Sequence, residues 1–113
     1  AGQVSTVDRY HTLVEEARAR FDRLGIGNVT CAQADGQDGW PEPESFDRIV
    51  LAGTVPEVPE ALFAQLAKGG RLVAPTGDAA RRDIVAWDRD GERLRVPFYQ
   101  QVPPLQEGRA GAL

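Results

Sequence analysis

Short apolar runs alternate with amphipathic segments from the beginning of the chain. Residues 4–8 are rich in β-branched side chains and predict a strand that ends at Asp8. From Tyr10 onward, apolar side chains recur at spacings of three and four, which predicts a helix with one buried face. The apolar positions of this helix are Leu13, Val14, Ala17, Phe21 and Leu24.

Glycines mark the end of the helix and a second strand follows them. Gly25 and Gly27 predict the helix end, because glycine commonly terminates helices. Residues 28–32 then predict a strand that leads into Asp35-Gly36. Residues 37–45 hold a glycine and two prolines and therefore predict a loop.

A third strand is predicted over residues 46–52. It contains the run Ile49-Val50-Leu51, and such a run is typical of a strand that is buried on both faces in the centre of its sheet. After a loop with two more prolines, the apolar spacing in residues 60–67 predicts a helix that ends at Gly69-Gly70.

The last part of the chain predicts antiparallel strands. Residues 71–74 predict a fourth strand and residues 75–78 a turn. The apolar segments 84–87 and 94–98 flank Asp90-Gly91, which is the strongest hairpin signal in the chain.

This order of elements indicates an α/β fold. Strand, helix, strand, loop, strand, helix and strand predict a doubly wound sheet that is mostly parallel, because parallel neighbours need crossover connections. The hairpin adds an antiparallel edge at the end. Residues 1–105 are predicted to form one domain and residues 106–113, rich in glycine and alanine, a flexible tail.

Composition narrows the classes of function. The 113 residues carry a net charge of -4 with acids and bases interspersed, which argues against a nucleic-acid partner. The longest apolar runs are strand-sized, so no membrane span is expected. A single cysteine, Cys31, and a single histidine, His11, predict neither a disulfide nor a structural metal site and favour the cytoplasm. The absence of methionine indicates that the natural start lies upstream of Ala1.

Two acids follow the first two predicted strands. Asp8 occupies the position at which nucleotide-binding α/β domains place a carboxylate for ribose hydroxyls, but an aspartate there can also cap the next helix. Asp35 would lie at the same edge of the sheet, where it could bind the exocyclic amine of an adenine, with Gly36 letting the ring approach the backbone. The alternative for Asp35-Gly36 is an ordinary turn.

Four segments resemble the protein-L-isoaspartate O-methyltransferase family in their order and spacing, and together they cover nearly the whole chain. They are VSTVDR, ADGQDGWPEPESFDRIVLAG, VPEVPEALFAQLAKGGRLVAPTGD and QVPPL. The third segment is the most specific, because it has the family's Pro-Glu-Val-Pro, then Leu, Gln and Leu in this order, and then Gly-Gly-Arg-Leu-Val-x-Pro-x-Gly.

The resemblance implies a Rossmann-like methyltransferase fold that uses S-adenosyl-L-methionine to methylate a carboxylate in a protein or peptide substrate. It implies a cofactor-binding set and a loop near the accepting carboxylate, and it assigns no catalytic side chain and no metal within the chain. The implied cofactor residues are Asp8, Arg9, Asp35 and Gly36, and the implied substrate-binding residues are Gly53, Thr54 and Val55.

The substrate loop departs from the family pattern, which usually has small residues in this place. The β-branched pair Thr54-Val55 narrows the loop. This change either alters the peptide substrate or is a tolerated variation. The acceptor is correspondingly open: an isoaspartyl residue, as is usual in the family, or an aspartate in a dedicated peptide.

The resemblance also implies that an amino-terminal strand and the cofactor's glycine loop are missing. No GxGxG pattern is present, and Gly25-Ile26-Gly27 follows a helix and is therefore a helix end. The missing strand would lie between the strand ending at Asp8 and the strand at residues 49–51. The sheet is thus expected to be split, with two strands exposing backbone edges, and the fragment is expected to be inactive alone.

Other interpretations stay open at this point. The chain could be a non-catalytic α/β module that binds a partner, or, less in keeping with Gly69-Gly70 and Pro75, a dehydrogenase domain. Trp40 could stack on an adenine or close the core of its loop. Trp87 is expected to pack in the core or against the hairpin, and Cys31 to be a packing residue.

Overall fold

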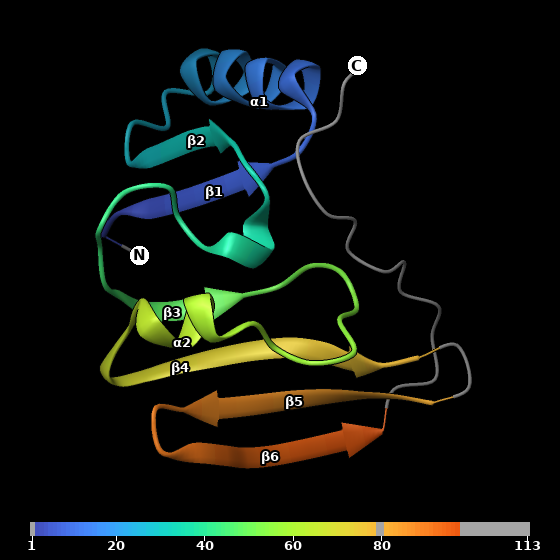
Figure 1. Ribbon diagram of the computed structural model, residues 1–113. Helices are drawn as coiled ribbons and strands as arrows, with labels where there is room; N and C mark the ends of the chain where they lie inside the picture. Colours follow the sequence, from blue (N-terminus) through green and yellow to red (C-terminus); the bar gives the residue numbers. More distant parts are fainter. Residues whose placement is uncertain (1, 79–80, 98–113) are drawn as a thin grey trace. The chain divides into compact units, whose positions relative to one another are not determined.

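The computed structural model describes residues 2–78 and 81–97, which form two compact units (Figure 1). The first comprises residues 2–36 and the second begins at Gln37. Each unit has its own β-sheet, with two strands in the first and four in the second. The expected splitting of the sheet is therefore observed.

The first unit is a strand-helix-strand motif. Strand β1 (Val4–Asp8) is followed by helix α1 (His11–Arg23) and strand β2 (Val29–Gln33). The two strands pair in parallel along their whole length, and α1 lies along this pair (Figure 1). Val14 on α1 and Cys31 on β2 are buried, so the predicted elements and the packing role of Cys31 are confirmed.

The second unit holds a mixed sheet with the strand order β3-β4-β5-β6. The first pair is parallel and the other two are antiparallel, which confirms the α/β class and the terminal hairpin. No helix within the described ranges is long and apolar enough to cross a membrane. The elements are β3 (Phe46–Val50), α2 (Glu60–Ala64), β4 (Leu66–Gly77), β5 (Arg82–Asp88) and β6 (Gly91–Pro97).

The core of the second unit lies on one face of β4. Leu72 and Ala74, two residues apart and hence on the same face, are 0% exposed. They form an apolar cluster with Leu62 of α2. Phe63 meets Trp87 of β5 edge-to-face with ring centroids 6.1 Å apart, which confirms that Trp87 is a packing residue.

The second helix and the fourth strand differ from the prediction. Helix α2 ends at Ala64 rather than at Gly69-Gly70, because β-pairing with β3 begins immediately afterwards: the amide of Phe46 donates to the carbonyl of Gln65 at 2.7 Å. The two glycines instead lie inside β4 where its register with β3 shifts. Gly69 has a φ of 79°, which suits such a bulge.

The turn predicted at residues 75–78 was also wrong over most of its length. Pro75, Thr76 and Gly77 continue β4 and pair with β5. A turn was predicted because Pro75 has no amide to donate to a neighbouring strand. Its carbonyl nevertheless accepts the amide of Val55 at 3.1 Å, so the proline fits within the strand. Strand pairing on both sides thus extends β4 through a sequence that looks like a turn.

Strand β3 is not buried on both faces. Val50 is 73% exposed, and β3 is an edge strand whose only partner among the described strands is β4. The apolar run at residues 49–51 predicted a central strand because it matches the composition of one. A strand that pairs on one side leaves part of that apolar surface uncovered. Predictions for residues 98–113, including the QVPPL segment and the tail, lie outside the described residues.

Ion pairs bind the two strands of the terminal hairpin together. The Arg93 guanidinium donates to Asp88 and holds the pKa of that carboxyl below its usual range. Asp88 also accepts the backbone amides of Asp90 and Gly91 at 2.8 and 3.1 Å, so it organises the turn. Within β6, Arg95 lowers the pKa of Glu92 in the same way.

We expect acid to weaken this hairpin through Asp88. Its folded pKa is lowered, so its contribution is complete above the unfolded pKa of about 3.9 and is lost as the pH falls through the folded pKa. Asp88→Asn keeps an acceptor for the turn amides but carries no charge. Urea unfolding between about pH 5 and about pH 3 should show a shallower pH dependence for this variant than for the wild type. Equal slopes would contradict this assignment.

A buried acid anchors the other end of the hairpin. Asp83 on β5 is 5% exposed, and its Oδ2 lies 2.8 Å from Nη1 of Arg95 and 3.8 Å from Nε of Arg81. Its Oδ1 is buried and accepts no hydrogen bond in the described part of the chain. A buried carboxylate in this position depends on its arginine partner.

We therefore expect an asymmetry between the two partners of this pair. Asp83→Leu should change the free energy of unfolding by about 1 kcal/mol or less, because the partly exposed Arg95 keeps its pairing with Glu92. Arg95→Leu should destabilise the protein more, because it leaves a buried charge behind. Chemical denaturation measures both, with Glu92→Gln as the control for the exposed pair. Equal losses from the two leucine variants would refute the dependence on Arg95.

Candidate functional site

Two acids lie at one edge of the sheet in the first unit. Asp8 is the last residue of β1 and pairs in register with Gln33, the last residue of β2. The ladder ends with the amide of Ala34 donating to the carbonyl of Asp8 at 3.0 Å, and Asp35 follows directly. The carboxyl ends of two parallel strands thus bring Asp8 and Asp35 to the same edge, as the sequence predicted.

The Asp8 carboxylate also shapes the turn into α1. Its Oδ1 accepts the backbone amide of Tyr10 at 3.0 Å, and Tyr10 is the N-cap residue of α1. The predicted capping role is therefore modified: Asp8 lies two residues before the N-cap and stabilises the entry to the helix. The side chain is exposed, so this bond leaves the carboxylate accessible from solvent.

Arg9 is held next to this acid by its backbone. Its carbonyl accepts a hydrogen bond of 2.9 Å from Nε2 of Gln33, which ties the turn after β1 to the end of β2. Its guanidinium carbon lies 5.5 Å from the centre of the Tyr10 ring, a cation–π distance. Arg9 therefore adds positive charge to the same edge as Asp8 and Asp35.

Gly36 lies against the first strand. It begins the short 3-10 helix Gly36–Asp38, and a Cβ at this position would lie 3.1 Å from Cγ2 of Val7. A side chain would crowd β1, so glycine keeps the backbone after Asp35 close to the strand. All four predicted cofactor residues of the first unit are thus adjacent to the carboxyl ends of β1 and β2.

The predicted substrate residues belong to the second unit and are buried. Val55 bridges to Thr76, donating its amide to the carbonyl of Pro75 and accepting the amide of Gly77, both at 3.1 Å. Its side chain is 1% exposed within the core cluster, and Thr54 is 5% exposed. The β-branched side chains therefore pack inward and fix the loop that begins at Gly53 to the end of β4.

Gln65, which no sequence pattern predicts as a site residue, organises the loop after Gly36. The side-chain amide of Gln65 hydrogen-bonds both the amide and the carbonyl of Trp40, at 2.7 and 2.9 Å. Gln65 is the glutamine of the family-like order Leu, Gln and Leu, so the resemblance marked it. A polar residue at a helix end, however, has no chemistry that predicts such a contact.

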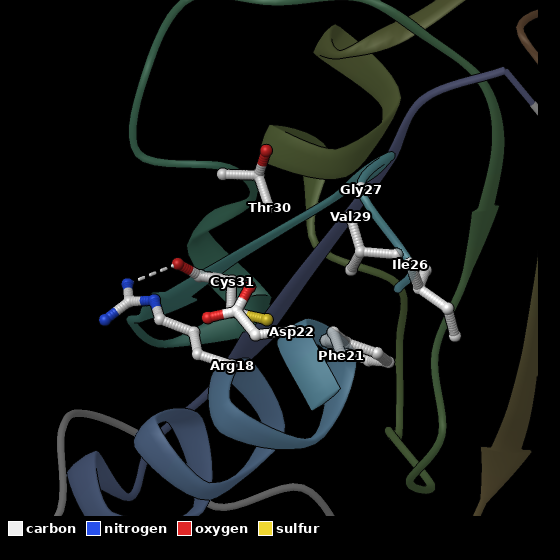
Figure 2. Close-up of a pocket in the computed structure, with 8 residues that line it drawn as sticks. All are labelled: Arg18, Phe21, Asp22, Ile26, Gly27, Val29, Thr30 and Cys31. Carbon is white, nitrogen blue, oxygen red and sulfur yellow. Dashed lines mark hydrogen bonds between the residues drawn. The ribbon is translucent and has the colours of Figure 1, made fainter. Parts of the chain in front are cut away.

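A pocket of about 280 Å³ lies between α1 and β2, away from these acids (Figure 2). It is lined by the last turns of the helix and by the first residues of the strand. Arg18 donates to the carbonyl of Cys31 at 2.6 Å across it. The residues that line the pocket are Arg18, Phe21, Asp22, Ile26, Gly27, Val29, Thr30 and Cys31.

Among the described residues, no group of three or more His, Cys, Asp or Glu is placed to hold a metal ion.

Comparison with known proteins identifies the family. A family model described as protein-L-isoaspartate(D-aspartate) O-methyltransferase matches residues 1–102. The chain belongs to this family. A protein-L-isoaspartate O-methyltransferase of Brucella anthropi is 49% identical over 80 residues, which are 71% of this chain and 37% of the relative. One of Maricaulis maris is 38% identical over 115 residues, covering 100% of this chain and 54% of the relative.

Solved structures confirm the Rossmann-like methyltransferase fold. A protein-L-isoaspartate O-methyltransferase superposes with a TM-score of 0.78 and 29% identity over 93% of this chain and 34% of its own. A Plasmodium falciparum protein described as a beta-aspartate methyltransferase, in complex with S-adenosyl-L-homocysteine, gives a TM-score of 0.72 at 20% identity, covering 92% of this chain and 52% of its own. This second similarity shows the fold alone.

The family is one of transferase enzymes, and the recognition made from the four segments is confirmed. The chain spans about half or less of the length of these relatives. The assignment of individual site residues stays a prediction.

Proposed function

We propose that this chain is part of an S-adenosyl-L-methionine-dependent protein carboxyl O-methyltransferase that acts on L-isoaspartyl residues in proteins or peptides. The observation that carries the proposal is the placement of Asp8 at the end of β1 and of Asp35 just after β2, at the carboxyl edge of their parallel sheet, in a chain of this family. In α/β sheets this edge is where nucleotide ligands bind.

The residues at this edge fit the adenosine part of the cofactor. The exposed carboxylate of Asp8 can accept hydrogen bonds from ribose hydroxyls while its Oδ1 keeps the amide of Tyr10. Asp35 can accept from the exocyclic amine of adenine, and Gly36 has no side chain to obstruct the ring. Arg9 adds a cation at the same edge, which limits the repulsion between the two acids.

Methyl transfer to a carboxylate depends mainly on how the methyl donor and the acceptor are positioned. When bound, S-adenosyl-L-methionine supplies a methyl group on a sulfonium, and an ionised carboxylate can take it without any proton transfer. The loop of Gly53, Thr54 and Val55 is suited to place a peptide, since the backbone of Val55 anchors it to the end of β4. No acid or base among the described residues has to act in this step.

We further propose that residues 1–105 form part of the methyltransferase domain and that the chain by itself is inactive. The 113 residues contain no GxGxG pattern, and β1 and β3 each have one partner strand in the described part of the chain. A buried, unpaired Cys31 and a net charge of -4 support a cytoplasmic protein that binds neither nucleic acid nor membrane. Methyl transfer by residues 1–113 alone would contradict the inactivity.

Asp8→Ala should weaken binding of S-adenosyl-L-homocysteine by about 1 to 3 kcal/mol, because the ribose hydroxyls lose their acceptor. Asp8→Asn should lose less, since an amide oxygen can still accept both from Tyr10 and from one hydroxyl. Calorimetric titration of the protein as its gene encodes it, including any sequence before Ala1, measures both affinities. Glu16→Ala, which removes an exposed acid from α1, is the matched control. Unchanged affinity in Asp8→Ala would refute the ribose role.

The acceptor is tested with a synthetic isoaspartyl peptide and its aspartyl twin. Transfer of a labelled methyl group should favour the isoaspartyl peptide in kcat/KM by at least about 100-fold, because the site must position a displaced carboxylate. A preference for the aspartyl peptide would indicate a dedicated substrate instead. Cofactor binding without transfer to either peptide would favour the non-catalytic module.

A further inference from the structure

Gln65 holds the loop at the beginning of the second unit. Residues 37–45 follow the Asp35-Gly36 pair and include two prolines, which have no amide hydrogen to donate. Such a segment cannot be fixed by pairing with a strand along its length. Its position must therefore depend on a few contacts at its ends.

The side chain of Gln65 provides the contacts at the beginning of this loop. Its Oε1 accepts the amide of Trp40 at 2.7 Å, and its Nε2 donates to the carbonyl of Trp40 at 2.9 Å. Nε2 also lies 3.4 Å from the carbonyl of Glu42. The side-chain amide thus pairs with Trp40 as a neighbouring strand would, and only one orientation of the amide satisfies both bonds.

The main chain of the same residue holds the other end. The amide of Phe46, the first residue of β3, donates to the carbonyl of Gln65 at 2.7 Å. Gln65 itself is fixed because it is the C-cap of α2, where its own amide donates to Leu62 at 3.2 Å. One residue therefore fixes both ends of the segment from Trp40 to Phe46.

Gly39 shows how closely this contact is fitted. A Cβ on Gly39 would lie 2.4 Å from Oε1 of Gln65, whereas the next backbone atom, the carbonyl oxygen of Ala61, is 3.6 Å away. The residue is buried and has a φ of 79°. The glutamine side chain thus occupies the space that any side chain at position 39 would need.

We propose that Gln65 is a positioning residue for the cofactor site. By fixing Trp40 it limits the path of Gln37 and Asp38, the residues that follow the Asp35-Gly36 pair along the chain. This path sets the place of the backbone that follows Asp35. The inference rests on the proposed function, in which Asp35 and Gly36 bind adenine, and it adds a residue that does not itself touch the ligand.

The test compares Gln65→Met, which keeps the length of the side chain without its hydrogen bonds, with Gln65→Ala in the protein as its gene encodes it. Both variants should raise the KM for S-adenosyl-L-methionine about tenfold, with kcat at saturating cofactor and the KM for an isoaspartyl peptide within about twofold of the wild type. A purely structural role would instead lower the thermal midpoint and change all kinetic constants together.

A double-mutant cycle with Gly39→Ala supplies the second measurement. Alone, this substitution should weaken binding of S-adenosyl-L-homocysteine, because the new methyl group displaces the Gln65 amide. In the Gln65→Ala background the methyl group meets no glutamine, so the additional loss should shrink to the backbone cost of a positive φ. Glu60→Gln, an exposed position at the start of α2, is the matched control.

The outcomes separate the two proposals. If the wild type binds the cofactor and the Gln65 variants bind it equally well, or the two substitutions are additive, the positioning role is wrong and the proposed function stands. If the wild type neither binds the cofactor nor transfers a methyl group, the proposed function fails and the role of Gln65 fails with it. A cofactor-specific KM effect with non-additive coupling supports both.

Discussion

The backbone pairing of β4 on both sides is the constraint on which the second unit depends. The strand has β3 as a parallel neighbour and β5 as an antiparallel one, and Leu72 and Val73 pair with both. Pairing with β5 extends the strand through Pro75, a residue that usually interrupts strands. Leu72 and Ala74 are fully buried because they pack in the cluster that includes Leu62 of α2. The loop at Val55 is then fixed because it joins the end of this same strand.

Local pattern was enough to predict the elements that are stabilised by their own sequence. The amphipathic spacing around Val14 predicted α1, and Asp90-Gly91 predicted the terminal hairpin, because helical periodicity and turn chemistry are local properties. The order of the elements then indicated an α/β fold. Parallel pairing of β1 with β2 follows from that order, so the edge at which Asp8 and Asp35 meet was also predictable.

Features decided by long-range pairing were not predictable in this way. Helix α2 is short because the residues after Ala64 pair with β3, beginning with the hydrogen bond from Phe46. Nothing in residues 60–67 themselves shows that this strand pairing replaces the helix. The run around Val50 has the composition of a central strand, but Val50 is exposed on an edge strand. Composition does not show how many partner strands a segment has.

The same distinction separates the proposed cofactor residues from the residue that holds the loop after them. Asp8 and Asp35 are recognisable because acids after parallel strands have a chemical reason to be there. The sequence gives no chemical reason to single out Gln65. Its contacts with Trp40 span 25 positions and arise only when the end of α2 lies beside the loop. A side-chain amide that replaces a missing strand is favourable here because the prolines at positions 41 and 43 prevent the loop from pairing for itself. The path of the loop from Trp40 to Phe46 thus depends on a residue outside the acidic edge.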